Sequence, residues 1–250
     1  MIDDRVFLGF PIKFKDVCHI YPPTVNDVSG NEHFNIYQSL FTMTQEELDD
    51  AYEENSKGFS DFKVPTPFEY LMLNFYQDDE VRQYILEGFE QFLHEPVTIE
   101  PDLDMILIGT DEEHLDIEVD LENPRLITKE DYFDFQNLIR QVMGDRLVEP
   151  PDPDEDPRVR RIKAKGRKRD RIVARRSQGP KFGTLLAAIC CMGIGLTPLN
   201  IGEMSYACVH WLIGMYQQSE EYDIDIRALL AGADSKKVKP KYWIRNLDLD

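Results

Sequence analysis

The chain has 250 residues, 42% of them apolar, so it is long enough to bury a core in one large domain or two small ones. Its net charge of −19 divides unevenly: residues 1–157 carry 10 basic and 38 acidic groups (−28), residues 158–176 carry 11 and 1 (+10), and residues 177–250 carry 7 and 8 (−1). An acidic surface of that size repels phosphate backbones and anionic membranes, so any nucleic-acid contact is confined to residues 158–176.

The first predicted elements are short strands followed by helices. Residues 6–20 are rich in β-branched and aromatic side chains and predict one or two strands and a turn, which YPPT ends. Residues 25–43 then place apolar side chains at helical spacing. Thr44 opens a capping box, TQEE, which predicts the start of a further helix.

A helical hairpin and a small sheet are predicted next. Thr66, Pro67 and Glu69 form a second capping box before an apolar run, and residues 79–95 carry a helical apolar stripe. Two helices joined by a short acidic turn are expected to pair. The β-rich runs 96–100, 104–109 and 114–120 are expected to join the N-terminal strands in one small sheet against these helices.

The first domain is expected to close with a helix over residues 126–144, capped by Thr128 and ended by Gly144. Its predicted apolar face consists of Phe133, Leu138, Ile139 and Val142. Residues 148–157 are rich in proline and acid, a composition that favours an extended linker. The basic arm, residues 158–176, follows; as a helix it would have only a thin apolar stripe, weakened by Gly166.

Three helices are predicted after the arm: one over residues 179–193, one capped by Asn200, and one that begins at Ile224 and ends near Gly232. Tyr242, Trp243 and Leu247 are expected to dock onto this helical unit. The sequence therefore predicts an α+β fold in three parts: an acidic domain (1–147) with a small sheet and a helical hairpin, a hinge and charged connector (148–178), and a small all-α unit (179–250).

The cysteines and the apolar runs point to a cytoplasmic protein without a membrane span. The four cysteines have neither the number nor the spacing of a disulfide framework or a zinc site, and the adjacent Cys190 and Cys191 are expected to be buried in a helix core. The N-terminus has early acids and too short an apolar run for a signal peptide. The longest apolar run, near residues 185–196, is too short to cross a bilayer.

No catalytic, metal-binding or cofactor-binding signature is present. The five histidines lack HExxH spacing, the acid clusters lack the pattern of a calcium loop, and the glycines form neither a dinucleotide nor a P-loop motif. His210 beside Trp211 is interpreted as a packed core histidine rather than a ligand site. We therefore expect a non-enzymatic protein that needs no cofactor.

The basic arm is the most distinctive feature, and two interpretations of it are open. Without interleaved aromatic side chains for base stacking it would bind phosphate only non-specifically. A charged connector that pairs with the acidic domain is the favoured interpretation, and nucleic-acid binding is the alternative. The cations considered for either role are Arg158, Arg160, Arg161, Lys163, Lys165, Arg167, Lys168, Arg169 and Arg171.

The order of features resembles tail assembly chaperones of tailed phages and prophages of Gram-positive bacteria. The resemblance runs through VPTPFEYLMLNFYQDDEVRQYILEGFEQFLHEPV, LITKEDYFDFQNLIRQVMG, the charged connector and the ending YDIDIRALLAGADSKKVKPKYWIRNLD. It implies a non-enzymatic protein of the bacterial host cytoplasm that keeps the helical tape measure protein soluble and helps to recruit tail tube subunits. Such proteins have no catalytic residues that could be carried over to this chain.

A chaperone for a helical client needs apolar grooves and enough like charge to stay soluble. Residues 67–94 and 181–230 are expected to supply the grooves, through side chains predicted to be exposed: Phe68, Tyr70, Phe75, Tyr84, Phe89, Trp211 and Tyr216. A nucleic-acid-binding phage regulator that uses the basic arm and a structural tail or neck protein are the alternatives. The sequence does not give the oligomeric state.

Overall fold

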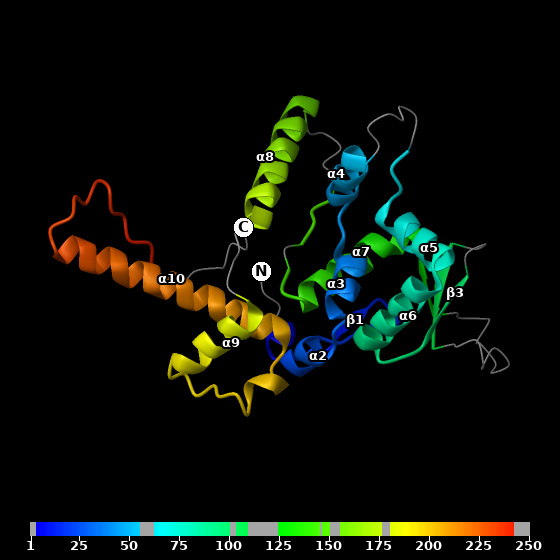
Figure 1. The fold of residues 1–250 in the computed structure, drawn as a ribbon, viewed down its shortest axis with the longest axis horizontal. Helices are drawn as coiled ribbons and strands as arrows, with labels where there is room; N and C mark the ends of the chain where they lie inside the picture. Colours follow the sequence, from blue (N-terminus) through cyan, green and yellow to red (C-terminus); the bar gives the residue numbers. More distant parts are fainter. Residues whose placement is uncertain are drawn as a thin grey trace.

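The computed structural model describes residues 4–55, 63–100, 104–109, 125–145, 147–150, 156–176 and 181–242. Figure 1 shows the N-terminal half as a body of helices and strands from which a basic helix and a long C-terminal helix project. In chain order the elements are α1 (Asp4–Phe7), β1 (Ile12–Phe14), β2 (Cys18–Ile20), α2 (Val25–Gly30), α3 (Phe34–Thr42), α4 (Gln45–Asn55), α5 (Pro67–Gln77), α6 (Asp79–Leu93), β3 (Val97–Glu100), β4 (Met105–Ile108), β5 (Leu126–Thr128), α7 (Lys129–Val142), α8 (Pro157–Arg176), α9 (Phe182–Cys191), the 3-10 turn η2 (Ile201–Glu203) and α10 (Tyr206–Leu230).

The predicted α+β class is confirmed, but the strands form two sheets rather than one. β1 and β2 make an antiparallel hairpin, and β3, β4 and β5 make an antiparallel sheet in that order. β5 covers the three residues that end at the predicted N-cap Thr128, and its Ile127 is fully buried and pairs with Ile106 of β4. The strand expected at residues 114–120 lies outside the described residues.

The predicted helix starts are largely correct because they depend on local chemistry. The Thr66 and Thr44 capping boxes both form, with each threonine amide donating to a glutamate three residues later. Asp78 caps α6 through the amides of Glu80 and Val81, and α5 packs against α6 as the predicted hairpin.

The main core is built from aromatic rings that different helices bring together. Phe41 of α3 meets Phe89 and Phe92 of α6 edge-on, with ring centroids 4.6 and 5.7 Å apart. Phe135 of α7 stacks near Phe89 and lies edge-on to Phe14 of β1. These contacts join the first sheet, α3, α6 and α7 into one packed unit.

The buried face of α7 differs from the predicted one. Thr128 caps the helix and Gly144 follows its end with a positive φ of 73°, both as expected. Tyr132 and Phe135 are buried, however, whereas Phe133 and Leu138 are only half-buried. The reason is that Phe135 is the side chain that reaches the core rings, which fixes the rotation of the helix.

The C-terminal helices also differ from the prediction. α10 is one continuous helix that includes the segment predicted as a separate helix from Ile224. Its N-cap is Ser205, whose hydroxyl accepts a hydrogen bond from the amide of Cys208 (3.2 Å). Asn200 instead accepts from the amide of Thr197 (2.7 Å) in the turn before η2. Gly232, with a φ of 94°, follows the end of the helix as expected.

The beginning of α10 lies in the core of the N-terminal half. Ala207 and Trp211 belong to the same buried cluster as the aromatic side chains of α3, α6 and α7. A second, smaller cluster joins Val25 of α2 to the C-terminal Ile189, Ile201 and Val209. The predicted units 1–147 and 179–250 thus share packed surfaces, and their division into independent domains stays a prediction.

The cysteines occupy different environments. All four are free; Cys18 and Cys208 are buried and Cys190 is half-buried. Cys191 is exposed, so the prediction that both adjacent thiols fill a helix core is wrong for this residue.

Candidate functional site

The basic arm is a helix, α8, along its whole predicted length. Lysine, arginine and alanine are good helix formers, Pro157 occupies the first helical position, and the carboxylate of Asp156 accepts the amide of Arg158 (2.7 Å) as an N-cap does. The Asp-Pro pair before the arm therefore starts the helix, a signal that the expectation of an extended linker overlooked. Gly166 is exposed, with no atom near the position of an added Cβ.

One face of α8 is paired with α4. The guanidinium of Arg167 forms two contacts with the carboxylate of Glu46, one of them a 2.9 Å hydrogen bond from Nε. The ammonium of Lys168 lies 3.1 Å from the carboxylate of Asp50. Glu46 and Asp50 are four residues apart on α4 and therefore lie on one face of that helix. The basic connector does pair with the acidic part of the chain, as the favoured interpretation expects.

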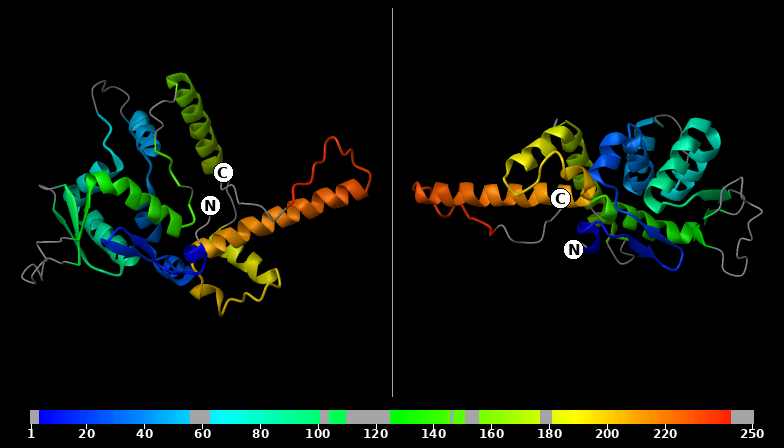
Figure 2. Two further views of the ribbon diagram at one scale, coloured as in Figure 1. Left: turned by 180° about the vertical axis from the view of Figure 1, so that it is seen from behind. Right: turned by 90° about the horizontal axis from the view of Figure 1, so that it is seen from below.

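The opposite face of α8 points to solvent. Arg158, Lys165 and Arg169 are exposed on this face. Lys163 is also exposed, but it lies on a side of the helix closer to α4. The side chains of Arg160, Arg161 and Arg171 lie outside what the structure describes. Figures 1 and 2 show α8 standing beside α4 at the edge of the molecule. It contributes no side chain to either buried cluster of the described residues.

The start of α10 is firmly anchored. The Ser205 hydroxyl donates to the carbonyl of Val6 (3.2 Å), and the backbone amide of Tyr206 donates to the carbonyl of Pro23 (2.8 Å). Ala207 approaches so close to Gly144 that an added Cβ there would lie 3.2 Å from the Ala207 Cα. A glycine is therefore required at this position both for its positive φ and for the contact between α7 and α10.

Two ionisable groups lie at this anchored end. Burial lowers the pKa of His210, and the nearby carboxylate of Asp145 opposes that shift. Burial also raises the pKa of Asp145, and the Arg140 charge opposes it. His210 packs against the Tyr206 ring at 4.9 Å. His210 is therefore packed, as predicted, but it is half-buried and belongs to neither buried cluster of the described residues.

The distal half of α10 extends away from the body (Figures 1 and 2). It carries exposed apolar side chains. The exposed fractions are 41% for Tyr216, 61% for Ile224 and 83% for Leu230. At 100° per residue, these three side chains lie on one side of the helix. Beyond the helix, the chain returns so that the rings of Tyr222 and Tyr242 meet at right angles 5.8 Å apart.

The predicted client-binding aromatics are mostly in the core. Phe68, Phe75, Phe89 and Trp211 are buried, so the expectation that they are exposed is wrong. They fill the space between helices, as large apolar side chains on a helix face usually do. Tyr70 and Tyr84 are half-buried, and Tyr216 is exposed as expected. The exposed apolar residues of α5 are Leu73 and Tyr76.

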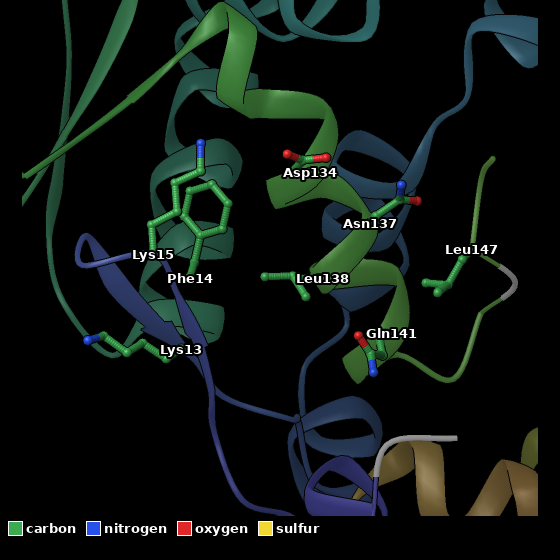
Figure 3. A pocket seen from close by; sticks show the side chains of 8 residues that line it. All are labelled: Lys13, Phe14, Lys15, Asp134, Asn137, Leu138, Gln141 and Leu147. Atoms are coloured by element: carbon green, nitrogen blue, oxygen red, sulfur yellow. The ribbon is translucent and has the colours of Figure 1, made fainter. Parts of the chain in front are cut away.

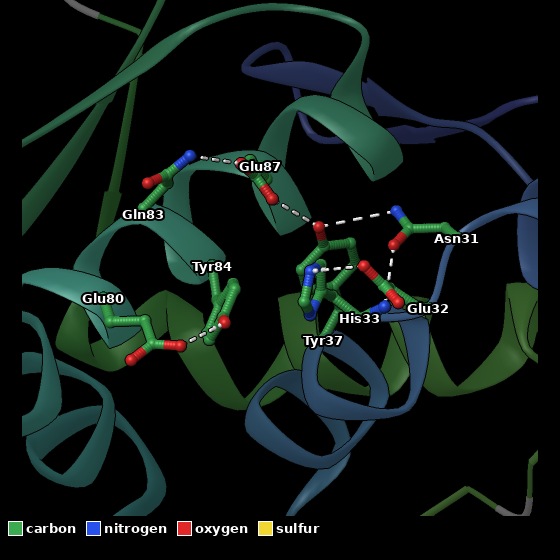
Figure 4. Close-up of polar contacts among 8 residues, drawn as sticks. All are labelled: Asn31, Glu32, His33, Tyr37, Glu80, Gln83, Tyr84 and Glu87. Carbon is green, nitrogen blue, oxygen red and sulfur yellow. Dashed lines mark hydrogen bonds and ion pairs between the residues drawn. The ribbon is translucent and has the colours of Figure 1, made fainter.

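A polar cluster joins the start of α3 to α6 (Figure 4). The Tyr37 hydroxyl donates to a Glu87 carboxylate oxygen at 2.6 Å, and burial together with that bond raises the pKa of Tyr37. The Tyr84 hydroxyl donates to Glu80 at 2.5 Å, and the His33 ring stacks on Tyr84 at 4.7 Å. The Tyr37–Glu87 hydrogen bond and the stacking of His33 on Tyr84 therefore join the start of α3 to α6, whereas Tyr84 and Glu80 both lie on α6.

A shallow hollow lies between β1 and α7 (Figure 3). It has a volume of about 370 Å³. Lys13 and Lys15 border it on one side, and Asp134, Asn137 and Gln141 of α7 on the other. Lys13 is paired with Asp16, and Lys15 is paired with Asp131. The two cations are thus held by their own carboxylates at the rim.

The described residues contain no group of three or more His, Cys, Asp or Glu side chains placed to bind a metal ion. Among the described helices, none combines the length and apolar character needed to cross a bilayer. Comparison with family models, curated proteins and solved structures gives no match. The candidate site is therefore identified from the structure of this chain, and it consists of the two faces of α8 and the exposed distal face of α10.

Proposed function

We propose that the protein is a non-enzymatic chaperone for an elongated helical client, the tape measure protein of a tailed phage, in the cytoplasm of the bacterial host. The observation that carries the proposal is the exposed apolar face of distal α10, formed by Tyr216, Ile224 and Leu230. An amphipathic client helix has an apolar face of its own and would bury this one. The resemblance of the chain to phage tail assembly chaperones supports the choice of client.

The charge distribution supports the same role. Four of the five charged side chains in residues 213–230 are acidic, and residues 1–157 carry −28. Like charge on successive copies bound along a long client would keep the complexes apart and soluble. Recruitment of tail tube subunits is a further part of the proposal.

The test is co-expression with the tape measure protein. The native chain is expected to raise the soluble fraction of the client, and the triple variant Tyr216→Ser, Ile224→Ser, Leu230→Ser is expected to lose this effect. The matched control, Leu73→Ser with Tyr76→Ser, removes exposed apolar side chains of α5 and is expected to behave as the native chain. A client no more soluble with the native chain than without it would refute the proposal. Loss in the control alone would move the docking site to α5.

Nucleic-acid binding by α8 is the second candidate, favoured by the exposure of Arg158, Lys165 and Arg169. It predicts retention of DNA or RNA at low salt that disappears when Arg160, Arg161, Arg167, Lys168 and Arg169 are replaced by glutamine. Absence of binding at low salt would eliminate it. A structural tail or neck protein, the third possibility, would be present in purified virions, whereas a chaperone would be absent.

A further inference from the structure

The outer face of α8 has a regular pattern of its own. Arg167 and Lys168 point to α4. At 100° per residue, the opposite side of the helix carries a stripe of mainly apolar residues that follow one another at intervals of three and four positions. This spacing is that of a helix-pairing seam. The stripe consists of Val159, Ile162, Gly166, Arg169 and Val173, all of them exposed.

A partner of this stripe has to bury apolar side chains and pair with cations at the same time. Ile162 is 71% exposed and Val173 is 57% exposed, although both lie among the cations of α8. A polyphosphate backbone would neutralise the cations but would leave these side chains in water. A helix with acids beside an apolar stripe would satisfy both, because it pairs the charges and buries the apolar groups.

The distal half of α10 has the complementary composition. Glu220, Glu221 and Asp223 are exposed there, and Glu220 and Asp223 lie on the same side as Tyr216 and Ile224. Within one chain, α8 stands next to α4 while distal α10 extends in a different direction (Figures 1 and 2). The complementarity is therefore available between two copies of the chain.

We infer that the protein self-associates through α8 of one copy packed on distal α10 of a second copy. The two contacts are reciprocal, so a two-fold dimer satisfies both at once. The inference does not depend on the proposed chaperone function. If both hold, the second copy's α8 covers the apolar face of α10 until a client helix displaces it.

The test is the oligomeric state of the full chain, measured by sedimentation equilibrium. A dimer is expected at about 50 mM NaCl, with a dissociation constant at least ~10-fold higher at about 500 mM, because exposed ion pairs are screened by salt. Reversing the α10 acids (Glu220→Lys, Glu221→Lys, Asp223→Lys) is expected to weaken the dimer at least ~10-fold at low salt. Reversing the α8 cations (Arg158→Glu, Lys165→Glu, Arg169→Glu) is expected to do the same.

The combined variant, with both sets reversed, is expected to dimerise again because the opposite charges are restored in exchanged positions. The matched control, Asp16→Lys, Glu32→Lys and Glu90→Lys, makes the same charge change at exposed sites elsewhere and should leave the dimer intact. Ile224→Gln, which keeps every charge, should weaken the dimer through the lost apolar contact. Circular dichroism of each variant checks that the helices are retained.

A monomer at low salt and micromolar concentration would overturn the inference. So would a combined variant that fails to dimerise although its helices are intact, or a control triple that weakens the dimer as much as the α10 reversal. DNA retention that depends on the α8 cations, with a dimer insensitive to Ile224→Gln, would assign the outer face of α8 to a polyanion instead.

Discussion

Gly88 is the position where one added methyl group tests the aromatic core most directly. It lies in the middle of α6, and a Cβ built there would be 2.5 Å from Cε2 of Phe41. Phe41 is 1% exposed, and its ring is held edge-on by Phe89 and Phe92, so it has little room to move. Replacing glycine by alanine inside a helix gains about 1 kcal/mol of helix propensity. Overpacking of a core costs about 1–3 kcal/mol, and the upper part of this range, about 2–3 kcal/mol, is expected here because 2.5 Å is far shorter than an ordinary carbon–carbon contact. After the gain in helix propensity is subtracted, Gly88→Ala is expected to destabilise the protein by about 1–2 kcal/mol.

The assay is urea unfolding followed by circular dichroism, supported by a thermal melt. A loss of this size lowers the Tm of a chain this long by roughly 2–8 °C. The control is Gly166→Ala in α8, where no atom lies within 4 Å of the added Cβ and only the gain in helix propensity, up to about 1 kcal/mol, is expected. A Gly88→Ala protein as stable as the native chain would show that the ring moves freely and that the core is not packed as described.

Three further predictions concern pH, capping and the α8 contact. A hydrogen bond from Lys129 lowers the pKa of Glu69 to about 2, so its stabilising effect is complete above the ordinary glutamate pKa and is lost as the pH falls through the folded-state value. Because the Glu69 side chain is about one-third exposed, Glu69→Gln is expected to reduce the free energy of unfolding by up to about 1 kcal/mol at pH 7. Near pH 2 the variant is expected to be as stable as the native chain. Urea titration at both pH values measures the difference. Ser205→Ala removes the α10 cap and is expected to lower the free energy of unfolding by about 1–2 kcal/mol, whereas an unchanged midpoint would show that the cap is dispensable. Glu46→Gln with Asp50→Asn is expected to raise trypsin cleavage within α8 several-fold, since two partly exposed ion pairs contribute about 0.2–1 kcal/mol each, and an unaltered rate would contradict the contact between α8 and α4.

The sequence predicted those features that depend on neighbours a few residues away. The capping boxes at Thr44 and Thr66 need only a threonine, a glutamate three residues later and a helix to begin. The hairpin of α5 and α6 needs only two amphipathic helices and a short turn. The sequence analysis also predicted a separate helix from Ile224. Residues 217–223, which precede it, contain no glycine or proline, and α10 continues through them.

Features that depend on distant partners could not be predicted. Arg167 and Glu46 are 121 residues apart, and nothing in the charge pattern indicates which acids would face the arm. The aromatic side chains of α5 and α6 look alike in sequence, yet Phe75 is buried and Tyr76 is exposed, because one side of the hairpin meets the rest of the core and the other does not. Burial of a particular ring is therefore a property of the assembled helices.

In α8, the cations that pair with α4 and the apolar stripe lie on different faces of the helix. Charge alone made the arm a candidate for nucleic acid, and charge explains the face that pairs with Glu46 and Asp50. It does not explain why Ile162 and Val173 lie at seam spacing on the other face, where they are exposed. An apolar stripe is useful only to a partner that can bury it, and a helix can do so whereas a phosphate backbone cannot. The apolar side chains, rather than the eleven cations, therefore decide in favour of a helical partner.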